Sequence, residues 1–215
     1  MARCSRLSAS LALCARSLAA LLLALSLGAP LVVSLGCKKS EAAQALPQLG
    51  TVGPFWLKDQ DGRTFSEANL DGSVWVAAFM FTRCPTVCPE MVRRMRDIQA
   101  RAKAAGVKLS LVSFSVDPEN DTPAALKAYA ARFAADESRW KFLTGEKETI
   151  FATARGMLVT AIPANDKSPI IHSEKFILVD ADGKIRRYYD STDEQDMTAL
   201  KQDAAALADE AAATR

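Results

Sequence analysis

Two cysteines framed by prolines follow directly on a long apolar run, in the segment Cys84-Pro85-Thr86-Val87-Cys88-Pro89. The apolar run covers residues 74–81, and its length and its β-branched and aromatic side chains predict a buried strand. Residues that precede proline avoid the α-helical region, and proline suits the first position of a helix. We therefore expect a helix over residues 89–105 with Cys88 at its N-cap, so that both thiols lie where a buried strand leads into a helix.

The spacing of the two thiols suits either a disulfide or a metal ion. Two residues four apart on a regular helix hold their Cβ atoms roughly 5–6 Å apart, whereas a disulfide needs about 3.8 Å. Placing Cys84 in a loop outside the helix lets the two sulfur atoms approach each other. The positive end of the helix and the neighbouring Arg83 both favour thiolate, so we expect a lowered pKa for the thiols.

Residues 1–37 have the composition of an export signal. The basic start is formed by Arg3, Arg6 and Arg16. An uncharged apolar stretch follows over residues 18–35, and Cys37 comes after small residues. This ending is similar to a bacterial lipoprotein signal, in which the cysteine is lipidated, with an uncleaved membrane anchor and ordinary secretion as alternatives. Each of the three places the rest of the chain outside the cytoplasm, and we expect a bacterial membrane anchor with the domain in the periplasm.

Behind the signal, residues 38–50 are polar and alanine-rich, which predicts a flexible linker to one domain over residues 51–215. A domain of this length buries a core without disulfides. Of the five cysteines, Cys4 and Cys14 belong to the signal and Cys37 is the lipid acceptor, which leaves one pair for the domain. That pair closes too short a loop to restrict the unfolded chain much, so stability does not explain it. The formal net charge of +2 predicts no nucleic-acid partner.

The order of the predicted elements is that of an α/β fold of thioredoxin type, with three layers, a central mixed sheet and flanking helices. Asp61-Gly62 and Asp182-Gly183 are turn signals that predict two hairpins. The expected strands cover residues 55–57, 63–65, 74–81, 107–116, 140–143, 175–179 and 184–189. Further helices are expected from Thr122, over residues 147–155 and over residues 196–213.

The only histidine, His172, precedes the apolar strand 175–179, which begins near the cysteine loop in a sheet of this type. Two thiolates and one imidazole suit Cu(I) or zinc; three such ligands satisfy Cu(I), whereas structural zinc takes four. A lone histidine is more often an ordinary surface or core residue, so spacing alone leaves its role open. A redox-active Cys84–Cys88 disulfide that needs no metal remains an alternative interpretation.

Four motifs in a fixed order resemble the SCO/SenC family. They are Phe-x-Phe-Thr-x-Cys-Pro-Thr-Val-Cys-Pro (79–89), Ser-Phe-Ser-Val-Asp-Pro-x-x-Asp-Thr-Pro (113–123), Arg-Trp-x-Phe-Leu-Thr-Gly (139–145) and His-Ser-x-x-Phe-x-Leu-Val-Asp-x-x-Gly (172–183). The resemblance covers the chain from about Gly53 to Asp190. It implies a membrane-tethered copper protein of thioredoxin fold that helps to mature the CuA centre of cytochrome c oxidase.

The same resemblance implies that Cys84, Cys88 and His172 bind one copper ion per chain. The implied partner is the CuA subunit of the oxidase or another extracytoplasmic copper protein. This sequence has Thr86 where many relatives carry aspartate, and Arg83 where they carry histidine or serine. The three implied ligands are unaffected by these departures.

Two acidic residues precede the helix that starts at Thr122. We expect Asp121 and Thr122 to accept hydrogen bonds from backbone amides at the helix start, and Asp117 to shape the turn. Asp117 is in addition a candidate for supporting the metal ligands through hydrogen bonds or for docking a partner protein, because α/β sheets carry functional groups at the carboxyl ends of their strands. Three methionines are expected in the core rather than on a metal: Met80, Met91 and Met95.

Three functions follow from these residues: a copper-binding assembly factor, a thiol-disulfide oxidoreductase that cycles Cys84 and Cys88, and a peroxiredoxin-like enzyme. The third is weakest, because the Thr-x-x-Cys arrangement and a downstream resolving cysteine are both missing. A reductase does not require His172, so its presence at the family position favours a copper chaperone over an enzyme. The cysteine pair is the only candidate for catalysis.

Overall fold

The computed structural model describes residues 46–164 and 168–214. The predicted export signal, with Cys4, Cys14 and Cys37, lies outside these residues, as does most of the predicted linker. Leu49 donates a backbone hydrogen bond to Ile185, and Arg186 donates to the carbonyl oxygen of Leu46, so the chain contacts the domain from the first described residue onward.

A six-stranded mixed sheet forms the centre of the domain, in the strand order β1-β10-β9-β4-β5-β6. β4, β5 and β6 are parallel to one another, while β9 runs antiparallel to β4 and β10 antiparallel to β9. The strands in chain order are β1 (Gly50–Thr51), β4 (Val74–Met80), β5 (Leu109–Ser115), β6 (Trp140–Leu143), β9 (Lys175–Val179) and β10 (Lys184–Asp190).

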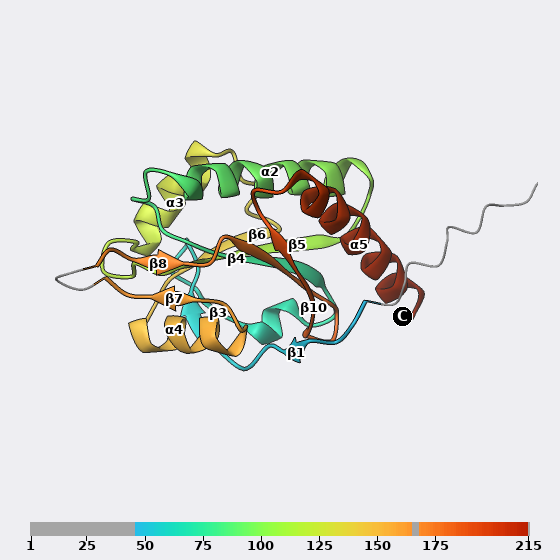
Figure 1. Cartoon of the computed structure of the whole chain (residues 1–215), viewed down its shortest axis with the longest axis horizontal. Helices are drawn as coiled ribbons and strands as arrows, with labels where there is room; N and C mark the ends of the chain where they lie inside the picture. The colour runs from blue at the N-terminus through green and yellow to red at the C-terminus, as the bar shows by residue number, and fades with distance from the viewer. Residues whose placement is uncertain (1–45, 165–167, 215) are drawn as a thin grey trace, which may run out of the picture. The chain divides into compact units, whose positions relative to one another are not determined.

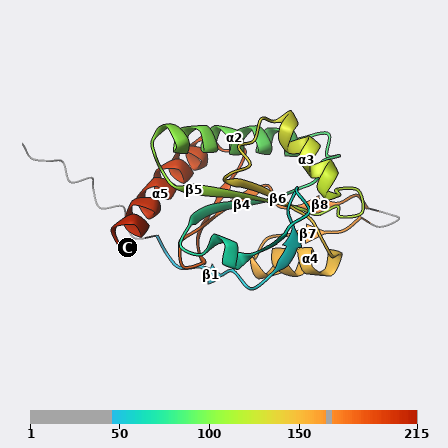
Figure 2. The same cartoon turned by 180° about the vertical axis from the view of Figure 1, so that it is seen from behind.

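All seven residues of β4 are buried, because both faces of the sheet are covered (Figure 1). The even-numbered side chains of β4, such as Val76, pack on one face of the sheet with the helices α2 (Val87–Ala104), α3 (Pro123–Arg132) and α5 (Glu194–Ala213). The odd-numbered side chains of β4, such as Trp75, pack on the other face with α4 (Lys147–Gly156) and the small hairpin of β2 (Trp56–Lys58) and β3 (Thr64–Ser66). The predicted three-layer arrangement with a mixed sheet is confirmed, and Figure 2 shows both outer layers from behind.

Both predicted hairpins are present, and a glycine in the left-handed region makes each turn possible. Gly62 (φ 76°) connects β2 to β3, and Gly183 (φ 73°) connects β9 to β10. The final helix begins at Glu194, slightly earlier than predicted, because Asp193 is its N-cap and accepts a hydrogen bond from the amide of Asp196.

The prediction that α2 begins at Pro89 with Cys88 as the N-cap is wrong. The helix begins at Val87 with Thr86 as its N-cap, so Cys88 is the second helical residue and Pro89 the third. Proline is tolerated there because the first four amides of a helix have no partner within it. Cys84 lies outside the helix, as expected.

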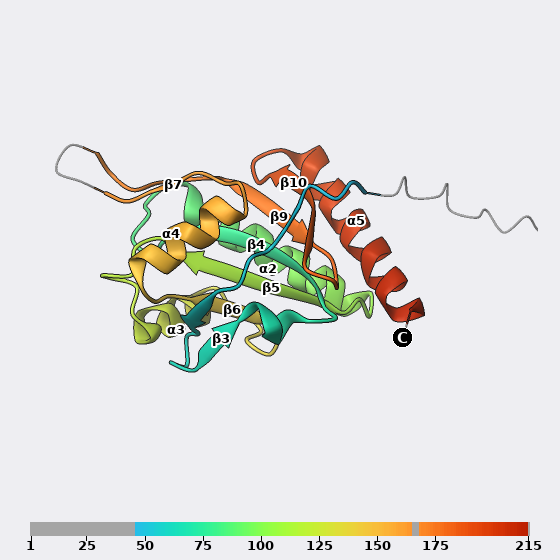
Figure 3. The same ribbon diagram turned by 90° about the horizontal axis from the view of Figure 1, so that it is seen from below.

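Three features were not predicted from the sequence. The first is the edge strand β1, which begins at Gly50 within the predicted linker and pairs with β10. A short 3-10 helix, η1 (Glu67–Leu70), follows β3. A narrow hairpin of β7 (Ala161–Ile162) and β8 (Ile171–His172) precedes β9 and extends from one end of the sheet (Figure 3). None of the helices in the described part of the chain combines the length and the apolar composition that crossing a membrane requires.

Candidate metal centre

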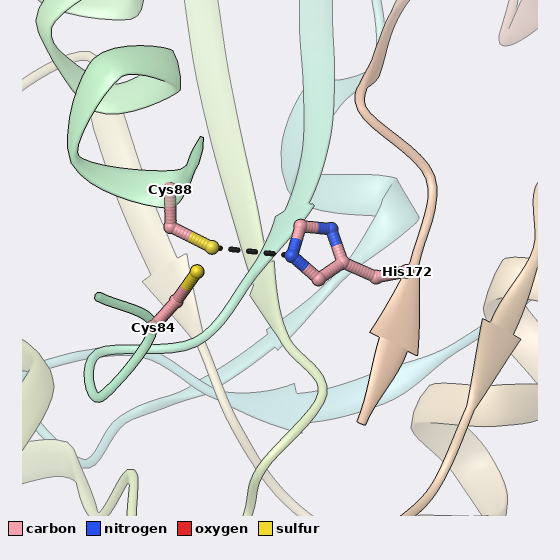
Figure 4. A group of neighbouring side chains, drawn as sticks. All are labelled: Cys84, Cys88 and His172. Atoms are coloured by element: carbon pink, nitrogen blue, oxygen red, sulfur yellow. Dashed lines mark hydrogen bonds between the residues drawn. The ribbon is translucent and has the colours of Figure 1, made fainter. Parts of the chain in front are cut away.

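Cys84, Cys88 and His172 converge at the end of the sheet where β4 leads into α2 (Figure 4). Their ligand atoms all lie within 4.8 Å of one another, and Sγ of Cys88 is 3.2 Å from Nε2 of His172. Both thiols are free and buried, while the imidazole is half-buried. The structure thus brings together all three residues that the sequence singled out.

Sheet topology places His172 beside the cysteines. β9 pairs antiparallel with β4, with Ala77 opposite Ile177, so β9 begins at the end of the sheet where β4 finishes. The cysteine loop follows β4 at that end. His172 lies just before β9, on β8, where it pairs with Ala161 of β7. The expectation that the strand after His172 begins near the cysteine loop is confirmed.

The imidazole ring is held from two sides. Nδ1 lies 3.0 Å from the carbonyl oxygen of Ser173, and the ring stands edge-on to that of Phe81, with centroids 5.7 Å apart. A carbonyl oxygen only accepts hydrogen bonds, so Nδ1 is the donor of this pair, and in a neutral imidazole the lone pair then lies on Nε2, which faces Cys88. This is the arrangement in which a histidine binds a metal through Nε2.

The two thiols differ in acidity. Burial by itself raises the pKa of Cys84, but hydrogen bonds from the amides of Cys88 and Thr86 outweigh it and leave the pKa below its ordinary value. Burial raises the pKa of the fully buried Cys88 thiol far above its ordinary range. The lowered pKa expected from the helix start therefore holds for Cys84, which faces the amides from outside the helix, and is wrong for Cys88.

Asp117 forms no hydrogen bond with Cys84, Cys88 or His172. Its Oδ2 accepts hydrogen bonds from Nε (3.1 Å) and Nη2 (2.8 Å) of Arg83, the neighbour of Cys84. Its Oδ1 accepts a hydrogen bond from the side chain of Asn120, and its carbonyl oxygen accepts one from the Asn120 amide. Asp117 shapes its own turn, as expected, and is joined to the cysteine loop through Arg83.

The expectation for Asp121 is wrong in its partners. Only Thr122 caps α3, accepting a hydrogen bond from the amide of Ala125. The carboxylate of Asp121 instead accepts hydrogen bonds from Thr82 and Ser115, and it is fully buried. Sequence reasoning missed these two partners, although a serine in the apolar strand β5 was a usable signal.

The donor set suits a soft metal ion. Two sulfur atoms and one imidazole nitrogen are the ligands that Cu(I) and zinc prefer. Among the described residues these are the only cysteines and the only histidine, so the domain offers three such ligands and not four. The three methionines expected in the core are each 1% exposed and pack within it: Met80, Met91 and Met95.

Comparison with known proteins gives a consistent result. The family model SCO1/SenC matches residues 43–207. The SCO1 protein homolog of Bacillus subtilis (strain 168) is 39% identical over 145 residues, which cover 66% of this chain and 75% of that protein.

Solved structures agree in fold. BsSco, a member of the Sco family of cytochrome c oxidase assembly proteins in which a disulfide switch has been identified, matches with a TM-score of 0.69 and 35% identity, over 77% of this chain and 98% of that one. Copper-bound ScoI of Arabidopsis thaliana matches with a TM-score of 0.62 and 27% identity, over 71% of this chain and 97% of that one. By the extent of the family match and by these relatives, the chain belongs to the SCO1/SenC family.

Proposed function

We propose that this protein binds one copper ion through Cys84, Cys88 and His172 and serves in the assembly of cytochrome c oxidase, holding or delivering copper for the CuA centre. The observation that carries the proposal is the convergence of two thiols and one imidazole nitrogen within 4.8 Å. The relatives support it, since BsSco belongs to a family of oxidase assembly proteins and the Arabidopsis ScoI structure contains copper.

Ligand number favours copper over zinc. Structural zinc takes four protein ligands in a tetrahedron, and the described residues supply three of the preferred kinds. Cu(I) accepts thiolate and imidazole ligands in lower coordination numbers.

A second function, thiol-disulfide oxidoreductase without metal, is favoured by one observation. Cys84 has a lowered pKa, so it is the more nucleophilic thiol, and Cys88 lies beside it as the resolving partner. The two functions use the same pair and differ in their need for His172. The oxidase subunit that carries CuA is the proposed partner in both cases, either as copper acceptor or as disulfide substrate.

We infer the location from the sequence. Residues 1–37 form a lipoprotein signal with Cys37 as the lipid acceptor, or an uncleaved anchor, and residues 38–50 tether the domain of residues 51–215. The protein is then attached to a bacterial membrane and faces the periplasm, an oxidising compartment in which the Cys84–Cys88 pair has to be kept reduced.

A copper titration of the reduced domain tests the function. Wild type is expected to bind one Cu(I) per chain against a competing chelator. Removing a residue that only hydrogen-bonds to a metal ligand lowers metal affinity about 10–100-fold. Cys84→Ser removes a ligand itself, so it should lower Cu(I) affinity by about 100-fold or more. The matched control is Met91→Leu, which replaces a buried sulfur of the core and should bind as wild type does. Undiminished binding by Cys84→Ser would refute the assignment.

A further inference from the structure

Cys84 ends a tight turn whose two central residues are held from outside. The amide of Cys84 donates a hydrogen bond to the carbonyl oxygen of Phe81 (3.3 Å), which makes Thr82 and Arg83 the centre of the turn. Thr82 donates hydrogen bonds to Asp121, and Arg83 donates hydrogen bonds to Asp117. Both acids come from the segment between β5 and α3, so one neighbouring segment holds the residues that lead to the thiol.

Of these two contacts, the one between Asp121 and Thr82 is buried. Oδ2 of Asp121 accepts hydrogen bonds from the Thr82 amide (3.0 Å) and from Oγ of Ser115 (2.6 Å), and Oδ1 accepts one from the Thr82 hydroxyl. Asp121 and Ser115 are both 0% exposed. Among the described residues no ion pair includes Asp121, so these hydrogen bonds are what offsets the desolvation of its charge. Hydrogen bonds to a buried charged group are about twice as strong as neutral ones.

The contact to Arg83 is the exposed one. The guanidinium side chain is 62% exposed, although the carboxylate of Asp117 is largely buried. Exposed ion pairs contribute little because water and salt screen them and because ordering a long side chain costs entropy. Of the two contacts, the one between Asp121 and Thr82 therefore restrains the turn more strongly.

We propose that the hydrogen-bonded chain Ser115–Asp121–Thr82 is a positioning device that sets where the sulfur of Cys84 lies relative to Cys88 and His172. The chain links the buried strand β5 to the turn, so the place of the thiol is determined by the sheet and not by the loop alone. The expected effect of this chain on metal binding rests on the proposed function. Its expected effect on disulfide formation is independent of that function, because formation of the Cys84–Cys88 disulfide also depends on how the two thiols are held.

Two buried serines of β5 give a matched pair of variants. Ser115→Ala removes the hydrogen bond that the Ser115 hydroxyl donates to Asp121 and the one that it accepts from the Asp117 amide (3.1 Å). Ser113→Ala removes the one that Ser113 accepts from Nε1 of Trp140 (3.0 Å), away from the turn. Both serines are at most 1% exposed, so the two variants should lower the thermal midpoint of the apo domain similarly. Thr82→Val removes the hydroxyl from the other end of the chain, and Thr82→Ser restores it.

Two quantities are measured for each variant: Cu(I) affinity by chelator competition, and the equilibrium constant for Cys84–Cys88 disulfide formation against glutathione in metal-free protein. Ser115→Ala and Thr82→Val should lower both by roughly tenfold, the usual scale for partners that orient a ligand. Thr82→Ser and Ser113→Ala should stay within about threefold of wild type. Should Ser115→Ala fail to fold, Thr82→Val carries the test, since Thr82 is only half-buried.

The inference is overturned if Ser113→Ala lowers both quantities as much as Ser115→Ala does, because the effect is then general destabilisation. It is also overturned if Ser115→Ala and Thr82→Val leave both quantities near wild type. A wild-type domain that binds no Cu(I) would instead refute the proposed function, and the disulfide measurement would still decide the positioning role.

Discussion

Nε2 of His172 lies 3.2 Å from Sγ of Cys88, and a hydrogen bond at Nδ1 directs the ring toward the thiol. Because burial raises the pKa of Cys88, this thiol stays protonated over the physiological range. A metal that binds here has to displace that proton, since thiolate and not thiol is the ligand. Metal binding at this site is therefore coupled to proton release.

The first prediction concerns pH. Cu(I) affinity should rise with pH between 6 and 8, by up to about tenfold per unit for each proton released, because the raised pKa of Cys88 keeps one proton on the apo site throughout this range. Chelator competition at several pH values measures the slope. A pH-independent affinity would mean that Cys88 is not a ligand.

The second prediction separates the two thiols. Iodoacetamide should alkylate Cys84 roughly tenfold or more faster than Cys88 at pH 7, because Cys84 has the lowered pKa and Cys88 the raised one. Peptide mass spectrometry at short reaction times measures both rates in the reduced protein. Urea-unfolded protein is the control, in which the rates should become similar.

The third prediction separates chaperone from reductase. His172→Ala retains both thiols and the amides of Thr86 and Cys88 that lower the pKa of Cys84, so thiol-disulfide exchange should remain within about threefold of wild type. Copper binding should weaken by about 100-fold or more, because one of three ligands is lost.

In cells that contain only the His172→Ala protein, at equal abundance and limiting copper, the CuA content of cytochrome c oxidase should fall. Normal CuA content would contradict copper handling and leave thiol chemistry as the function. Cys84→Ser abolishes either activity and does not discriminate between the two.

The fourth prediction concerns the exposed ion pair at the cysteine loop. Asp117→Asn weakens the pair with Arg83, whose side chain is 62% exposed, so the free energy of unfolding should change by less than about 1 kcal/mol. Cu(I) affinity should fall only slightly, since the stronger restraint on the turn is Asp121. Chemical denaturation and chelator competition measure the two effects, and a large loss of affinity would assign Asp117 a direct part in the site.

The fifth prediction concerns alkaline stability. The pKa of Tyr189 is raised, first by burial and then by the hydrogen bond that its hydroxyl donates to Asp203. A group whose pKa is raised on folding stabilises the fold below its unfolded pKa, which is about 10 for tyrosine, and that contribution is lost as pH rises through the folded pKa. The free energy of unfolding should fall above about pH 10, less steeply in Tyr189→Phe. Equal slopes in denaturant titrations would contradict this.

Much of the fold was predictable because its determinants are local. The apolar run that forms β4, the glycines with positive φ at Gly62 and Gly183, and the cap at Thr122 are properties of short segments, and the structure confirms each of them. The start of α2 was misplaced by two residues because proline is tolerated at any of the first helical positions, where amides lack partners.

The sequence by itself determined which side chains are available for chemistry, since the described domain contains only two cysteines and one histidine. Only the tertiary structure decided how they act together. Antiparallel pairing of β9 with β4 brings His172 to Cys88, burial makes Cys88 the weaker acid, and Asp121 bonds the turn before Cys84 instead of its own helix. Burial and pairing across long stretches of chain depend on the order of strands in the sheet, which no single segment of sequence contains.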